Sequence, residues 1–300
     1  MDGEFKFACP ACGQRLACDT GQAGVVIQCP ACQEMLAVPT FGLPTREASR
    51  AEPGSFPASR ADRDTWISLA AGLGIAFLAV LFPFLGWVFH YLGTIIHELG
   101  HWVVLLLFAY PSVPVFHFVE GGATVSFSRM PLLLLAVYGA WIHLLWRNRG
   151  HRLVLVGLGG LFAGYVLLAH TGLDKLVTLA AGHAAQLLVA GVFLYRAWAR
   201  AAILAAMERP LYAALGFHMV GVQLAFAVSV LWDGTARNAY IHRENAVNDF
   251  MALQNQAGVP LDLSLAVILV CAMAVPVISF LAFRYRAWWA DKVQQLVGRG

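Results

Sequence analysis

The five residues HELGH, at positions 97–101, could hold a metal ion and use it. On a helix His97 and His101 are four residues apart and share a face, so two imidazoles can bind one zinc ion. Glu98 is then placed to take a proton from a water molecule that the metal has made more acidic. The motif therefore predicts a hydrolytic zinc centre of the HExxH type, with Glu98 as the general base.

This motif lies within an apolar stretch, residues 91–109, that otherwise consists mostly of Leu, Val, Ile, Trp and Phe. A glutamate and two histidines are costly in hydrocarbon unless they have partners, so their position favours a functional centre over a chance match. Two other readings stay open. The residues could form a buried cluster that only joins helices, or they could line a path that transports metal.

A catalytic zinc has three protein ligands and one open position, so a third ligand is needed. His183 lies about ten residues into a later apolar stretch and shares a helical face with Gln186. These two residues predict a functional site, the alternative being an interhelical hydrogen bond. Further candidates for the third ligand are His170, Glu244 and Asp249.

Four of the six cysteines form two C-P-A-C turns, made by Cys9, Cys12, Cys29 and Cys32. Each turn directs two thiolates to one point, and two turns complete a tetrahedron around zinc. Residues 1–38 are too few to build a core of their own, so metal would hold them together. The spacing predicts a small β zinc ribbon whose closed structural site performs no catalysis and whose role is to bind a protein partner.

The rest of the chain must position these residues, and its composition is that of a membrane protein. It is 59% hydrophobic and 12% charged, against roughly 45–50% and about 25% in soluble proteins. We count about seven apolar stretches, which predict a mainly α, polytopic bundle of about 6–7 spans. They are residues 66–88, 91–109, 131–146, 151–169, 175–198, 211–232 and 263–283.

Three segments follow from this pattern: the zinc ribbon over 1–38, a flexible linker over 39–64, and a membrane metalloprotease domain over 65–290. Reduced cysteines favour a cytoplasmic ribbon. Seven crossings would then place the arginine-rich loops outside, against the positive-inside rule. We expect a bacterial inner membrane and a cytoplasmic ribbon. The net charge of +3 gives no reason to expect nucleic acid as a partner.

The HELGH motif in a membrane helix resembles the site-2-protease family of intramembrane zinc metalloproteases. This resemblance implies that His97 and His101 bind catalytic zinc, that Glu98 is the base, and that the β-rich residues 112–128 form a hairpin that presents an edge to substrate. The family's aspartate ligand, in a Leu-Asp-Gly motif, best matches Asp174, which lysine follows in place of glycine. The third ligand is thus His183, the preferred candidate, or Asp174.

We therefore expect an enzyme with one catalytic and one structural zinc ion that hydrolyses peptide bonds of membrane-embedded proteins. Its partners would be the lipid bilayer, a membrane-protein substrate and a protein bound by the ribbon. The alternative is a catalytically inactive relative that acts as a membrane scaffold through its zinc ribbon.

Overall fold

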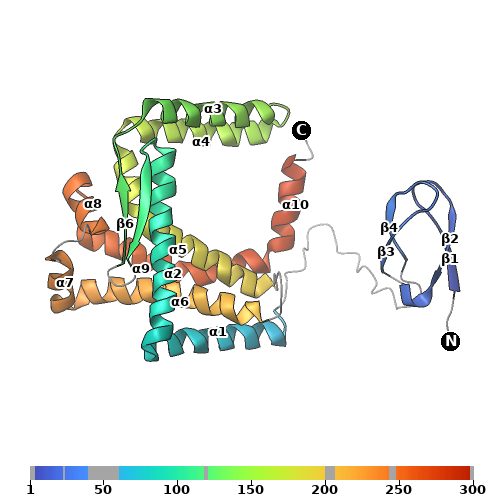
Figure 1. Cartoon of the computed structure of the whole chain (residues 1–300), viewed down its shortest axis with the longest axis horizontal. Helices are drawn as coiled ribbons and strands as arrows, with labels where there is room; N and C mark the ends of the chain where they lie inside the picture. Colours follow the sequence, from blue (N-terminus) through green and yellow to red (C-terminus); the bar gives the residue numbers. More distant parts are fainter. Residues whose placement is uncertain are drawn as a thin grey trace. The chain divides into compact units, whose positions relative to one another are not determined.

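The computed structural model describes residues 4–22, 24–39, 61–117, 121–199, 207–242 and 248–297. The chain divides into two compact units, Met1–Pro57 and Ala58–Gly300, and each is described by itself (Figure 1). Most of the predicted linker, residues 39–64, lies outside the described residues.

The N-terminal unit consists of two β-hairpins. Strand β1 (Glu4–Ala8) pairs antiparallel with β2 (Arg15–Asp19), and β3 (Val26–Gln28) pairs antiparallel with β4 (Met35–Ala37). A short 3-10 turn, Thr20–Gln22, follows β2. One C-P-A-C turn connects the strands of each hairpin, so the predicted small N-terminal β region is confirmed.

The two turns repeat one another in backbone geometry. The N–H of Gly13 donates to the carbonyl of Cys9 at 2.8 Å, and the N–H of Gln33 donates to the carbonyl of Cys29 at 2.8 Å. Both donors have positive φ, +76° at Gly13 and +60° at Gln33. Glycine adopts this left-handed conformation freely and glutamine does not, so the second turn holds its geometry at a conformational cost.

The second unit is a bundle of apolar helices. Among the described residues, five helices are long and apolar enough to cross a membrane. They are α1 (Arg63–Leu81), α4 (Arg152–His170), α5 (Leu173–Ala199), α6 (Glu208–Trp232) and α9 (Leu261–Arg284). Large apolar side chains such as Val80, Leu132 and Leu188 are more than two-thirds exposed, which a water-soluble surface rarely allows. The chain is therefore a helical membrane protein.

Two further helices account for the other predicted spans. Helix α2 (Pro83–Leu107) carries the HELGH motif and is not one of the five candidate spans. Helix α3 (Pro131–Arg147) is apolar but has only 17 residues. The boundary expected between the stretches 66–88 and 91–109 was wrong. The chain breaks at Phe82 because Pro83 has no N–H to continue α1 and suits the first position of a new helix.

Helix α5 is central, since it contacts α2, α6 and α9, and Figure 1 shows α2 crossing it. Small residues permit these close approaches. A Cβ at Gly100 of α2 would lie 2.6 Å from the backbone oxygen of Ala181 in α5, and a Cβ at Gly216 of α6 would lie 2.8 Å from Leu194. Small residues at helix crossings are how membrane helices come into direct contact.

A β-hairpin lies against α2 (Figure 1). Strand β5 (Ser112–His117) pairs antiparallel with β6 (Gly121–Ser126), as the sequence predicts for residues 112–128. The side chain of Arg129 fixes the end of the hairpin by donating to the carbonyls of Phe108 at 3.2 Å and Ala169 at 2.8 Å. The hairpin is thereby held beside the HELGH helix.

Two short helices between α6 and α9 were not predicted. They are α7 (Gly234–Ile241) and α8 (Asp249–Ala257), and α8 packs against α5. Their low apolar content gives no periodic signal for a span. A final helix, α10 (Arg286–Val297), follows α9.

Candidate metal centres

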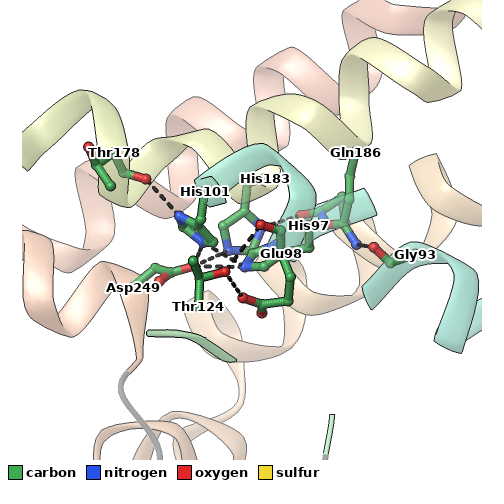
Figure 2. Close-up of polar contacts among 10 residues, drawn as sticks. Gly93, His97, Glu98, His101, Thr124, Thr178, His183, Gln186 and Asp249 are labelled. Atoms are coloured by element: carbon green, nitrogen blue, oxygen red, sulfur yellow. Dashed lines mark hydrogen bonds and ion pairs between the residues drawn. The ribbon is translucent and has the colours of Figure 1, made fainter. Parts of the chain in front are cut away.

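The two histidines of the HELGH motif lie side by side on α2, as helical spacing requires. Their Nε2 atoms are 3.1 Å apart (Figure 2). The Nδ1 atom of His101 lies 2.7 Å from the backbone oxygen of Thr178 in α5. Because a carbonyl oxygen only accepts, Nδ1 carries the hydrogen, and Nε2 of His101 is left with a lone pair that faces His97.

Asp249 comes to this pair from the first turn of α8. Its Oδ2 atom is 2.9 Å from Nε2 of His97 and 3.2 Å from Nε2 of His101. A carboxylate and two imidazoles therefore meet at one point.

His183 of α5 approaches the same point from another side. Its Nε2 atom is 3.9 Å from Oδ2 of Asp249, and its ring stacks on Phe250 with centroids 4.5 Å apart. One ligand atom each from His97, His183 and Asp249 lies within 4.8 Å of the others, close enough to hold a metal ion. The sequence predicted His183 here and gave Asp249 only as a further candidate.

The spacing of these donor atoms suits a small tetrahedral cation. Nitrogen and oxygen ligands at zinc bond lengths would be about 3.3 Å apart, and the separations among His97, His101 and Asp249 are 2.9, 3.1 and 3.2 Å. The glycine before His183 supports the same conclusion. A Cβ at Gly182 would lie 2.5 Å from Nε2 of both His97 and His101. Only glycine leaves room for the imidazoles at this position.

Glu98 is held beside the cluster by the hairpin. The hydroxyl of Thr124 on β6 donates to Oε2 of Glu98 at 2.7 Å and also lies 3.1 Å from the backbone oxygen of Glu98 (Figure 2). A Cβ at Gly122 would lie 2.5 Å from Cγ of Glu98. The glycine thus lets the strand pass directly over the carboxylate, and Thr124 fixes its orientation.

The other candidates for a ligand lie elsewhere. Asp174 is buried and accepts a hydrogen bond from Tyr110 at 2.9 Å. It precedes His183 by nine residues on α5, which separates them by about 13 Å along the helix axis. His170 lies 2.6 Å from the hydroxyl of Tyr138. Glu244 lies outside the described residues. Neither Asp174 nor His170 is among the described residues that converge on His97.

The four cysteines of the N-terminal unit form a second candidate centre. The sulfurs of Cys9 and Cys32 are 3.8 Å apart, and those of Cys12 and Cys29 are 3.7 Å apart. Four thiolates around a tetrahedral zinc would be separated by about 3.8 Å. The N–H of Cys32 donates to the sulfur of Cys29, which lowers the pKa of that thiol to about 7. Cys29 can therefore supply a thiolate to a metal near neutral pH. At Cys32 the N–H of Glu34 lowers the pKa, but the hydrogen bond with Cys12 and burial outweigh it and raise the pKa to about 12.

The sequence did not predict the residues that orient the donors. Thr124, Thr178 and Gln223 are polar residues on strands or helices without a motif, and only the fold brings them to the centre. Their signal in the sequence is weak. Gln223 alone stands out, as an amide within an apolar helix.

Fold and sites together define a helical membrane protein with a four-cysteine cluster and a separate His/Asp cluster, each able to hold a metal ion. No protein-family model, curated protein or solved structure matches the chain.

Proposed function

We propose that this protein is a membrane-bound zinc peptidase whose active site is the His/Asp cluster. The observation that carries the proposal is the convergence of His97, His101 and Asp249 within 3.2 Å of one another, with the Glu98 carboxylate adjacent in the same helix. The resemblance of the HELGH motif to site-2 proteases supports the same activity. His183 is the fourth candidate donor.

A bound zinc ion would supply Lewis-acid chemistry, since it polarises a carbonyl and makes water more acidic. The chain's own residues supply the rest. Glu98 accepts a proton from the water molecule and later returns it, because its carboxylate lies on the residue directly after His97. Thr124 holds that carboxylate by a hydrogen bond of 2.7 Å. The carbonyl of Thr178 keeps Nε2 of His101 free of hydrogen.

The hairpin offers a way to bind the substrate. Among the described strands, β5 and β6 pair only with each other, so each has a second edge that an extended peptide could join. Cleavage requires an unwound peptide, and an added strand is unwound by definition. Strand β6 also carries Thr124, which would place the peptide close to Glu98.

The setting of the enzyme follows from the same features. Its substrates would be membrane proteins, because the site belongs to a bundle of apolar helices in a lipid bilayer. The four-cysteine unit would hold a structural zinc ion and bind a protein partner. A bacterial inner membrane, with this unit in the cytoplasm, is the proposed location.

Glu98→Gln tests the mechanism. The amide cannot accept a proton, so cleavage of a membrane-embedded peptide by the purified variant should be abolished. The metal content should remain at about two ions per chain, because Glu98 is not a ligand in this scheme. Undiminished cleavage by the purified variant would refute the proposed role of Glu98.

A second function needs a test because four donors converge. If His97, His101, His183 and Asp249 all bind at once, the centre has no open position, which is typical of structural zinc. The chain would then be an inactive membrane scaffold. A hydroxamate that binds through the metal separates the two functions. Binding to the wild-type protein, measured by a shift in thermal stability, supports the peptidase. Metal without hydroxamate binding supports the scaffold.

A further inference from the structure

A line of side-chain amides joins His183 to the backbone of α2. Nδ1 of His183 is 2.9 Å from Oε1 of Gln223 in α6, and Nε2 of Gln223 donates to Oε1 of Gln186 in α5. Nε2 of Gln186 in turn donates to the backbone oxygen of Gly93 at 2.8 Å. Figure 2 shows Gln186 pointing to Gly93, one turn before His97. The line therefore begins at His183 of α5 and ends on α2, the helix that carries His97 and His101.

The chemistry of its last member fixes the direction of the whole line. The carbonyl of Gly93 can only accept, so Gln186 must turn its NH₂ group toward it and its oxygen toward Gln223. Gln223 must then direct its NH₂ group to Gln186 and its oxygen to His183. An amide oxygen only accepts, so Nδ1 of His183 must carry the hydrogen. The other ring nitrogen, Nε2, is left with a lone pair directed at the cluster.

From this geometry we infer that Gln223 and Gln186 are positioning residues that hold His183 as an Nε2 donor, and that His183 thereby binds the same metal as His97 and Asp249. The inference rests on the proposed function, since it needs a metal at the His/Asp cluster. It adds two residues outside the HELGH motif, and it assigns His183 and His101 the same tautomer. At His101 this tautomer is fixed by a direct hydrogen bond from Nδ1 to a backbone carbonyl. At His183 it is fixed by a hydrogen bond from Nδ1 to Gln223, whose amide is oriented by that of Gln186.

Packing alone does not explain the arrangement. The ring of His183 stacks on Phe250 and on Phe226, with centroids 4.5 and 5.8 Å away. Stacking fixes the plane of the ring and is indifferent to which nitrogen carries the hydrogen. Gln223 is only 3% exposed, and a buried amide costs free energy unless it is fully bonded. Its specific contribution is the choice of tautomer.

The test uses the full-length, detergent-solubilised protein. Its affinity for Zn²⁺ is measured by competition with a chelator, separately for the His/Asp cluster and the four-cysteine cluster. Gln223→Leu removes the acceptor and should weaken the His/Asp site about 10- to 100-fold, the usual effect of losing an outer partner of a metal ligand. Gln223→Glu keeps an oxygen that accepts from Nδ1 but loses the NH₂ group that donates to Gln186, so its affinity should lie between those of Gln223→Leu and the wild type. The cysteine site should be unchanged in both variants.

Two further variants make the result specific. Tyr212→Phe removes a hydrogen bond to Glu208 on the same helix, eleven residues from Gln223, and should leave the affinity unchanged. The double variant His183→Ala/Gln223→Leu should be no weaker than His183→Ala alone, because Gln223 acts through His183. Wild-type affinity in Gln223→Leu, or no recovery in Gln223→Glu, would overturn the inference while leaving the proposed function intact. Absence of any second zinc from the wild-type protein would overturn both.

Discussion

Gly182→Ala is the sharpest perturbation of the His/Asp cluster, because it adds one methyl group at its centre. That methyl would lie 2.5 Å from Nε2 of His101 and from Cε1 and Nε2 of His97. Ordinary contact needs about 3.5 Å, so the two imidazoles or α5 itself must move by about 1 Å. Metal bonds tolerate about 0.2 Å, and the two histidines can no longer share one ion.

The effect on stability should be small compared with the effect on metal binding. Overpacking costs about 1–3 kcal/mol, and alanine recovers about 1 kcal/mol of helix propensity over glycine. We therefore expect a free energy of unfolding lowered by about 0–2 kcal/mol. The affinity of the cluster for zinc should fall at least as far as when an outer partner is lost, about 100-fold.

The assay is metal content after dialysis against a chelator, with thermal unfolding measured in parallel. Gly191→Ala is the matched control, since it lies on the same helix and its Cβ would meet Ser279 and Val275 at an ordinary 3.7 Å. Gly182→Ala should retain about one ion per chain, in the cysteine cluster, and Gly191→Ala about two. A Gly182→Ala protein that is folded and binds zinc as tightly as wild type would show that the two histidines do not share a metal.

Three further outcomes are expected. Thr124→Val should lower the cleavage rate about tenfold or more, because a hydrogen bond to the charged Glu98 is lost, whereas Thr124→Ser should retain the rate and neither should change metal content. Asp174→Asn should keep both metals, since Asp174 is bonded to Tyr110; loss of the His/Asp metal would show that its placement is wrong. Cys29→Ser should remove only the metal of the N-terminal unit and unfold that unit, whose folding depends on it; metal analysis and limited proteolysis report both, and an unchanged metal content would contradict the assignment of the four-cysteine cluster.

The sequence predicts those parts of the molecule that depend on local periodicity. Each of the apolar stretches is helical, although 66–88 spans the end of α1 and the start of α2, and the spacing of His97 and His101 on one helical face is what the structure shows. The boundary between α1 and α2 was misplaced because hydropathy is continuous there, while the break depends on the missing N–H of Pro83.

The completion of the His/Asp cluster could not be read from periodicity. Asp249 follows a polar segment and begins a short helix, so nothing local separates it from other acidic residues. Asp174 matched a motif, yet it lies about two and a half helical turns from His183 and is bonded to Tyr110. Thr124 reaches Glu98 only because the hairpin folds back along α2. These contacts depend on tertiary packing, which a single sequence does not display.

The late position of Asp249 in the chain also sets the order in which the centre is made. Asp249 follows His97 by 152 residues, which takes roughly 8 to 30 s to synthesise at about 5–20 residues per second. During that time a nascent chain carries the HELGH helix without its carboxylate donor. The full set of donors is present only once α5 has packed on α2 and α8 has packed on α5. If the cluster is the proposed peptidase site, a ribosome-bound fragment that ends before Asp249 lacks one of its donors.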